Sequence, residues 1–87
     1  MKIRNDLVLR KVGGTWAVFP IGEGLNAYRN IMKLNDTGAF LWQKLCQEIS
    51  MEKLTVEFAK EYGLDKENAA ATVEQYVNML LKNNILS

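Results

Sequence analysis

Few residues in this sequence could carry out chemistry. There is no histidine, so the side chain that most often serves as a general base or metal ligand is missing. The one cysteine, Cys46, has no histidine to activate its thiol, and its place on an apolar helical stripe predicts a small core residue. Glu57 and Glu61 lie on one face of a predicted helix and offer too few ligands for a metal, so they are expected to be solvated. We therefore predict no catalytic residue, no metal and no cofactor, and a protein that is not an enzyme.

The stretch from Gly22 to Ala27 matches the pattern G-x-G-x-x-A, which binds a pyrophosphate in dinucleotide-binding proteins. That function requires a helix directly after the motif, because the helix N-terminus holds the phosphate. Here the composition of residues 28–34 predicts a strand instead. The stretch is therefore interpreted as a turn.

The composition predicts one small globular domain over residues 1–87. A hydrophobic fraction of 48% is too high for a disordered chain and is sufficient for a core. No apolar run approaches the roughly 18 residues of a membrane-spanning helix, and the N-terminus lacks the apolar segment of a signal peptide. A single cysteine fits a reducing compartment. These features predict a cytoplasmic protein without membrane contact, and a net charge of +1 argues mildly against a nucleic-acid partner.

The N-terminal third has the pattern of a β-hairpin. Leu7 to Val12 and Thr15 to Phe19 are rich in Val, Leu, Trp and Phe, and Gly13-Gly14 separates them. Glycine adopts the positive φ of a two-residue hairpin turn without steric cost. A loop of this length would place Leu9 and Val18 on one face and Lys11 opposite Trp16.

The third predicted strand runs directly into a helix. The strand is expected from Tyr28 to Leu34, and the helix from about Asp36 to Glu48. Asn35 is the expected N-cap, and an acidic residue at position 36 is favourable in the first turn. This short strand is expected to form an edge of the sheet beside a helical layer.

Two further helices are predicted after this one. The second begins at Ser50 and ends at Tyr62, where Gly63 stops it, and the third runs from Asp65 to about Asn83. The apolar stripe of the third helix contains Val73, Tyr76, Val77, Leu80 and Leu81, and the tail Ile85-Leu86 is expected to dock on the core. The fold class is therefore α+β and winged-helix-like, with a three-stranded antiparallel sheet followed by a three-helix bundle.

A winged helix raises the possibility of DNA binding through the last helix. Residues 65–83 carry two lysines against three acidic residues, so this helix would repel phosphates rather than attract them. A DNA-binding regulator is therefore kept only as an alternative. The basic residues of the chain occur mainly in its strands and loops, where they can help to steer an acidic peptide.

The segment Tyr28 to Trp42, YRNIMKLNDTGAFLW, resembles the hallmark of the PqqD family, in which a strand ending in Leu-Asn meets Glu/Asp-Thr-Gly-Ala and an apolar helix with Trp. The hairpin and the last helix also fit, so the resemblance covers nearly the whole chain. It implies a recognition domain that binds the leader of a ribosomally made precursor peptide and presents it to a modifying enzyme, often a radical SAM protein. Many members have Asp-Gly after the first helix, where this chain has residues 46–51, CQEISM, so assignment to the pyrroloquinoline-quinone branch stays open.

The resemblance implies that the leader adds as a strand beside the third strand and over the third helix. The residues support such a site, because strand addition requires an unpaired edge and a neighbouring apolar groove. The predicted edge consists of Asn30, Ile31, Met32, Lys33 and Leu34. The predicted groove wall is an exposed margin of the last helix at Val73, Glu74 and Val77, where preceding alanines leave room for a guest side chain.

Two other interpretations remain open beside leader binding. One is the DNA-binding regulator, and the other is a subunit that docks on an enzyme without any role in peptide binding. An exposed edge strand also permits pairing between two copies, so we expect either a monomer or an edge-paired homodimer.

Purified protein is expected to contain no stoichiometric transition metal and to turn over no substrate alone, since the sequence has no histidine and no cysteine pair. Elemental analysis tests the first expectation, and stoichiometric zinc or iron would contradict it.

Overall fold

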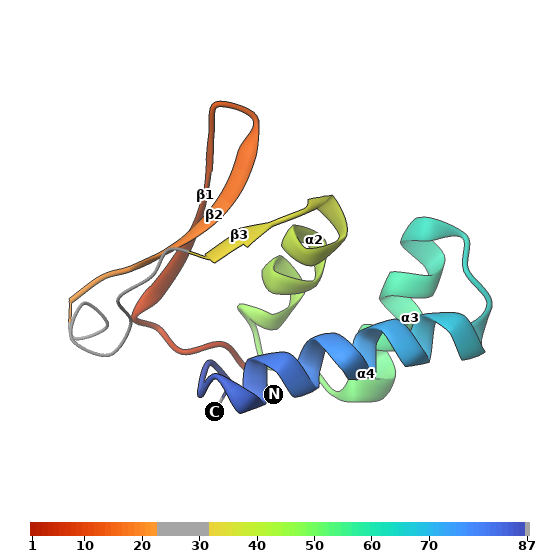
Figure 1. The fold of residues 1–87 in the computed structure, drawn as a ribbon. Coiled ribbons are helices and arrows are strands. Elements are labelled where there is room, and N and C mark those ends of the chain that lie inside the picture. The colour runs from red at the N-terminus through yellow and green to blue at the C-terminus, as the bar shows by residue number, and fades with distance from the viewer. Residues whose placement is uncertain (23–31, 87) are drawn as a thin grey trace.

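The computed structural model describes residues 1–22 and 32–86. Within them, a three-stranded antiparallel sheet is followed by three helices, which confirms the predicted α+β fold (Figure 1). The strands are β1 (Leu7–Val12), β2 (Thr15–Pro20) and β3 (Met32–Leu34), and the helices are α2 (Asp36–Leu45), α3 (Met51–Tyr62) and α4 (Lys66–Lys82).

The sheet has the order β1-β2-β3, so β2 is central and β3 is an edge strand. Gly13 and Gly14 form the hairpin turn with φ of 57° and 81°, values that residues with a side chain rarely adopt. The two-residue turn fixes the register, and the predicted pairs of Leu9 with Val18 and Lys11 with Trp16 are confirmed.

Each helix begins at the predicted cap. The side chains of Asn35, Ser50 and Asp65 accept hydrogen bonds from backbone amides in the first turns of α2, α3 and α4. Gly63 ends α3 in the left-handed conformation, with φ of 61°.

The first helix is shorter than predicted. It ends at Leu45 rather than Glu48, because the chain beyond it pairs with the N-terminus. The Ile49 amide donates to the Met1 carbonyl over 3.1 Å, and the Met1 amine donates to the Ile49 carbonyl over 3.0 Å. The prediction of Cys46 as a core residue is wrong for the same reason, since Cys46 lies at the end of the helix and is exposed.

The predicted third strand is described only at its C-terminal end. Met32, Lys33 and Leu34 pair with β2, and the remainder of the predicted strand, including Asn30 and Ile31, lies outside the described residues.

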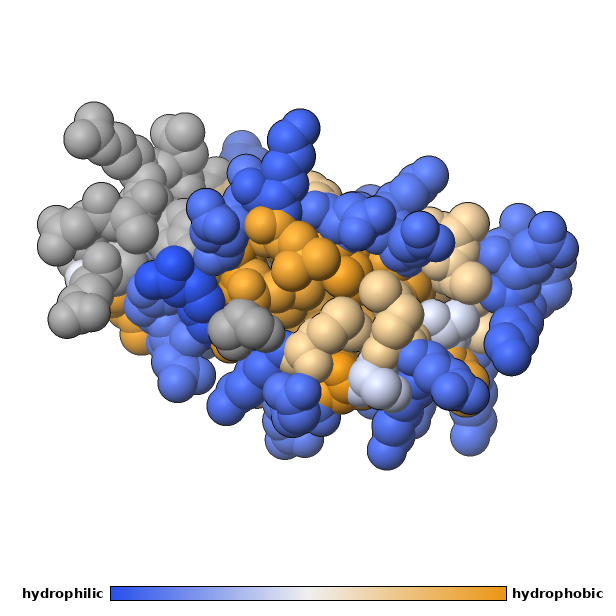
Figure 2. All heavy atoms as spheres, turned by 90° about the horizontal axis from the view of Figure 1, so that it is seen from below, coloured by the Kyte–Doolittle hydropathy of each residue, from blue (hydrophilic) through white to orange (hydrophobic). Residues whose placement is uncertain are grey.

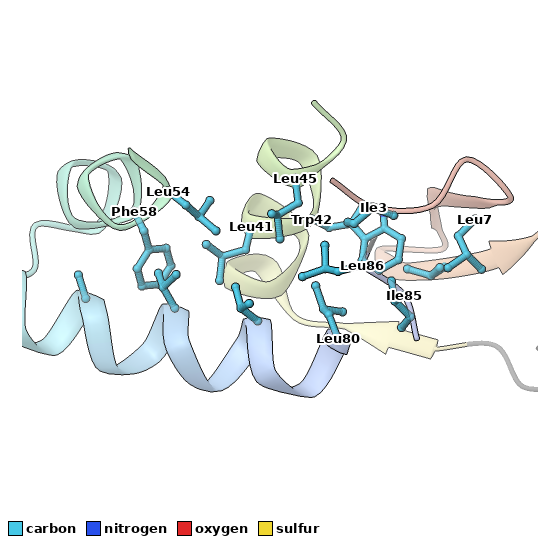
Figure 3. Packing of buried hydrophobic residues seen from close by; sticks show 14 residues of the cluster. Ile3, Leu7, Leu41, Trp42, Leu45, Leu54, Phe58, Leu80, Ile85 and Leu86 are labelled. Carbon is cyan, nitrogen blue, oxygen red and sulfur yellow. The ribbon is translucent and has the colours of Figure 1, made fainter. Parts of the chain in front are cut away.

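The core lies where α2 crosses α3 and α4 (Figure 3). Trp42 and Leu45 of α2 are 1% and 0% exposed, and side chains of α4 point toward them and toward Phe58 of α3 (Figure 3). The buried side of α4 consists of Ala69, Val73, Val77 and Leu80.

The two ends of the chain close this core. Ile3 and Leu86 form an isolated β-bridge, and the Ile3 amide donates to the Leu45 carbonyl over 2.8 Å. Ile85 and Leu86 are buried, which confirms the predicted docking of the tail. Leu81, placed on the buried stripe by the sequence, is 53% exposed.

Leu45→Ala is expected to destabilise the domain by about 3 kcal/mol, because it removes a fully buried side chain and leaves a cavity. Leu81→Ala is the matched control and should change stability by less than about 0.5 kcal/mol. Urea unfolding followed by circular dichroism measures both, and equal effects would show that this description of the core is wrong.

Candidate functional site

The sheet has two edge strands, and the phase of its hydrogen bonds decides what each edge offers. In an antiparallel ladder, pairs that exchange backbone hydrogen bonds alternate with pairs whose N–H and C=O groups point the other way. The Ile21 amide donates to the Asp6 carbonyl over 2.8 Å, just beyond the ends of β1 and β2. Hydrogen-bonded pairs recur every two residues on each strand, so Val8 with Phe19, and then Arg10 with Ala17, are hydrogen-bonded pairs.

The same alternation sets the direction of the β3 backbone. Because Ala17 bonds toward β1, the residues on either side of it bond toward β3, where their partners are Met32 and Leu34. Lys33, the partner of Ala17, therefore directs its own N–H and C=O away from the sheet. These two groups can receive an added strand.

The other edge strand is protected. Because Arg10 bonds toward β2, the neighbouring Leu9 directs its carbonyl to the outer edge of β1. The Arg10 guanidinium donates to this carbonyl over 2.9 Å. A charged side chain folded over an edge carbonyl competes with an incoming strand. The β3 edge is therefore the better candidate for strand addition.

A groove of about 400 Å³ lies beside β3, between this strand and α4. Lys33 and Leu34 border it from the strand, and Leu41 contributes from α2. The face on which α4 lies shows an apolar area framed by hydrophilic side chains (Figure 2). The residues that α4 contributes to the groove are Thr72, Gln75, Tyr76 and Met79.

Tyr76 joins the two helices that border the groove. Its hydroxyl donates to the Gly38 carbonyl over 2.8 Å, and its ring lies close to the Gly38 Cα. A Cβ on residue 38 would meet the Tyr76 ring at an ordinary contact distance of 3.5 Å but would crowd Asn35 Oδ1 at 3.1 Å, so glycine leaves room for the cap. Burial raises the pKa of Tyr76, and the Cys46 thiol adds a smaller effect, so the hydroxyl stays a donor at neutral pH.

Asn35 makes the junction between β3 and α2 abrupt. Its Oδ1 accepts from the Gly38 amide over 2.8 Å and from the Thr37 hydroxyl over 3.0 Å. Asn35 is therefore the one residue between the end of the strand and the start of the helix. This places the N-terminus of α2 directly beside the open edge of β3.

The prediction of an exposed margin at Val73, Glu74 and Val77 is wrong. Val73 and Val77 are 0% and 1% exposed because they pack into the core. Glu74 is exposed, but it is not among the described residues that line the groove. On the strand, Met32 and Leu34 are half-buried and Lys33 is exposed, as an edge of this kind requires.

The face of α4 that borders the groove is offset by one residue from the predicted face, since Thr72 and Tyr76 line the groove in place of Val73 and Val77. Tyr76 and Met79 are three residues apart and lie on one face. Both are half-buried and pack against the edge of the core. The sequence feature that could have indicated this face is that Tyr76, at the margin of the apolar stripe, and Met79 share it with the polar residues Thr72 and Gln75.

The described lining of the groove offers apolar surface and neutral hydrogen-bonding groups. Lys33 is the one charged residue among the described lining residues, and strand alternation directs its side chain to the other face of the sheet; the remaining lining is apolar or carries neutral amide and hydroxyl groups. No group of three or more potential metal ligands occurs in residues 1–22 and 32–86. Burial raises the pKa of the Cys46 thiol, with Lys2 opposing, and this disfavours a reactive thiolate.

The fold and the site define a class of protein: a small α+β domain with an open sheet edge beside an apolar groove. The family described as "Coenzyme PQQ synthesis protein D (PqqD)" matches residues 17–86. The chain therefore belongs to the PqqD family.

Two solved structures share this fold. "TbiB1 in Complex with the TbiA(beta) Leader Peptide" superposes with a TM-score of 0.77 at 17% identity, covering 100% of this chain and 95% of that one. "Lasso peptide synthetase B1 complexed with the leader peptide" gives a TM-score of 0.73 at 19% identity, covering 97% of this chain and 93% of that one. Identities this low show the fold alone.

A comparison with curated protein sequences gives no match. Among the described helices, none combines the length and the apolar character needed to cross a membrane.

Val77→Glu is expected to lower stability by about 3–5 kcal/mol, because it buries a charge without a partner in the core. Gln75→Glu introduces the same side chain at an exposed position two residues away and should leave the domain folded. Thermal unfolding by circular dichroism distinguishes the two variants. A stable Val77→Glu variant would mean that α4 is rotated relative to this structure.

Proposed function

We propose that this domain binds the leader segment of a ribosomally made precursor peptide as a strand added to β3. The observation that carries the proposal is the outward backbone of Lys33 at the border of the groove. Backbone groups pair with many sequences, and a neighbouring groove selects among them through alternate side chains. The site would consist of Met32, Lys33 and Leu34 together with Thr72, Gln75, Tyr76 and Met79; Asn30 and Ile31, which lie outside the described residues, remain proposed peptide-binding residues.

The chemistry of the groove suits a peptide strand. Inward side chains of the guest would rest on Leu34, Tyr76 and Met79, which are half-buried and provide apolar surface without filling the groove. The neutral polar groups of Thr72 and Gln75 can bond to guest backbone groups that do not pair with β3.

Simple energetics give a useful affinity. Four to six new hydrogen bonds at roughly 1 kcal/mol net each, plus a few buried apolar side chains, give about micromolar affinity after ordering costs. Such an affinity would let the domain bind a leader and release it after modification.

The comparisons support this direction. The titles of both similar structures name a bound leader peptide. Membership of the PqqD family supports a role in peptide recognition without catalysis. We further propose that the domain acts in the cytoplasm and presents the leader to a modifying enzyme, for which a radical SAM protein is the first candidate.

Lys33→Pro tests the proposal. Proline removes the outward amide, and it leaves the β2 ladder intact because the Lys33 amide does not bond to β2. Affinity for the precursor peptide encoded nearest to this gene should fall at least about tenfold, or 1.4 kcal/mol. Isothermal titration calorimetry measures the change.

Two further variants act as controls. Lys11→Pro makes the same substitution on the protected β1 edge, where the Lys11 amide also points away from β2, and it should leave peptide affinity unchanged. Met32→Pro removes a donor to β2 and should lower stability. A folded Lys33→Pro variant with normal peptide affinity would exclude strand addition at β3.

Two further assays test the alternative functions. Binding of duplex DNA at low salt, with no peptide binding, would favour a DNA-binding regulator. Binding to the modifying enzyme, with no peptide binding, would favour a docking subunit.

A further inference from the structure

The charges on the outer face of the sheet form a short row that ends at the open edge. Strand alternation places Arg10, Ala17 and Lys33 side by side on the face turned away from the core, one on each strand. The Arg10 guanidinium bonds to the Leu9 carbonyl at the outer edge of β1, so Lys33 is the cation of this row that lies at the open edge. Arg10 and Lys33 are the charged members of this face within β1, β2 and the described part of β3.

A strand added to β3 would continue this row. The guest residue directly opposite Lys33 points its side chain to the same outer face, whether the guest runs parallel or antiparallel to β3. The residues before and after it point to the inner face. There they meet Leu34, Tyr76 and Met79 at the groove.

We infer that the leader recognised by this chain carries an acidic residue opposite Lys33, with an apolar residue on each side of it. This inference rests on the proposed function and specifies the chemistry of the guest. Lys33 would thus have two roles. Its backbone pairs with the guest whatever the guest sequence, and its ammonium group determines specificity by selecting a carboxylate.

The acidic preference follows from the surroundings of Lys33. Oppositely charged residues directly across a strand pair attract, and like charges in the same place repel. Arg10 lies two strands away with its guanidinium at the outer edge of β1, so the selection rests on Lys33. The described strands carry no acidic side chain on this face, so none of them would compete for Lys33.

The apolar flanks follow from the other face. A charged guest side chain pointing inward would lose water beside Tyr76 and Met79 without gaining an oppositely charged partner among the described lining residues. A leucine, valine or phenylalanine in that position would instead cover half-buried apolar surface.

Phage display of random 15-residue peptides tests the inference without a known precursor. The bait is the full chain as wild type, Lys33→Glu or Lys33→Gln, with Lys60→Glu as a control that changes the net charge equally on exposed α3 surface. Wild type and Lys60→Glu should select an acidic residue between two apolar ones. Lys33→Glu should select a basic residue at that position, and Lys33→Gln should lose the charge preference.

Synthetic peptides then measure the effect. Changing the acidic residue of the best wild-type peptide to lysine should weaken binding to the wild-type domain about three- to tenfold, and Lys33→Glu should restore it. The difference should shrink at high salt, because the pair is exposed. An unchanged charge preference across all four baits would overturn the acidic assignment.

The outcomes also separate this inference from the proposed function. Suppose that the selected peptides bind wild type, lose binding with Lys33→Pro and do not respond to the charge at position 33. Strand addition at β3 would then stand, and the inference of an acidic residue opposite Lys33 would be overturned. Selected peptides that bind Lys33→Pro as well as wild type overturn both.

Discussion

The hydrogen bonds of Asn35 hold the site together. By accepting from the first turn of α2, this side chain ends β3 and begins the helix without a loop between them. Gly38 then comes close enough for its carbonyl to accept from Tyr76 of α4, and a Cβ at position 38 would crowd Asn35 Oδ1, the oxygen that caps the helix, at 3.1 Å. The edge strand, the start of α2 and the middle of α4 are thus fixed relative to one another, and the groove is the space that remains between them.

The two edges of the sheet differ in a way that suits a recognition domain. On β1, the Arg10 side chain covers an outward carbonyl. On β3, Lys33 presents its backbone groups next to apolar and neutral polar surface. An exposed edge is a hazard in most proteins, because any other strand can pair with it. Restricting the open edge to a short strand beside a shaped groove limits which chains can bind there.

The groove is built for contact rather than for reaction. Apart from Lys33, the polar side chains of its described lining are amides and hydroxyls, and the Tyr76 hydroxyl is already used in joining two helices. Membership of the PqqD family and the shared fold with leader-peptide complexes agree with this chemistry. This chemistry is what the proposed role in leader binding requires.

The sequence by itself determined the local structure. Gly13-Gly14 set the hairpin register, and Asn35, Ser50, Asp65 and Gly63 set helix ends, because caps and turns depend on a few neighbouring residues. Tertiary structure decided the rest. Pairing with the N-terminus shortened α2 and exposed Cys46. Packing against α2 and α3 decided that Val73 and Val77 are buried while Tyr76 and Met79 face the groove. Successive residues on a helix differ by only about 100°, so a broad apolar stripe does not reveal which margin stays open until its partners are in place.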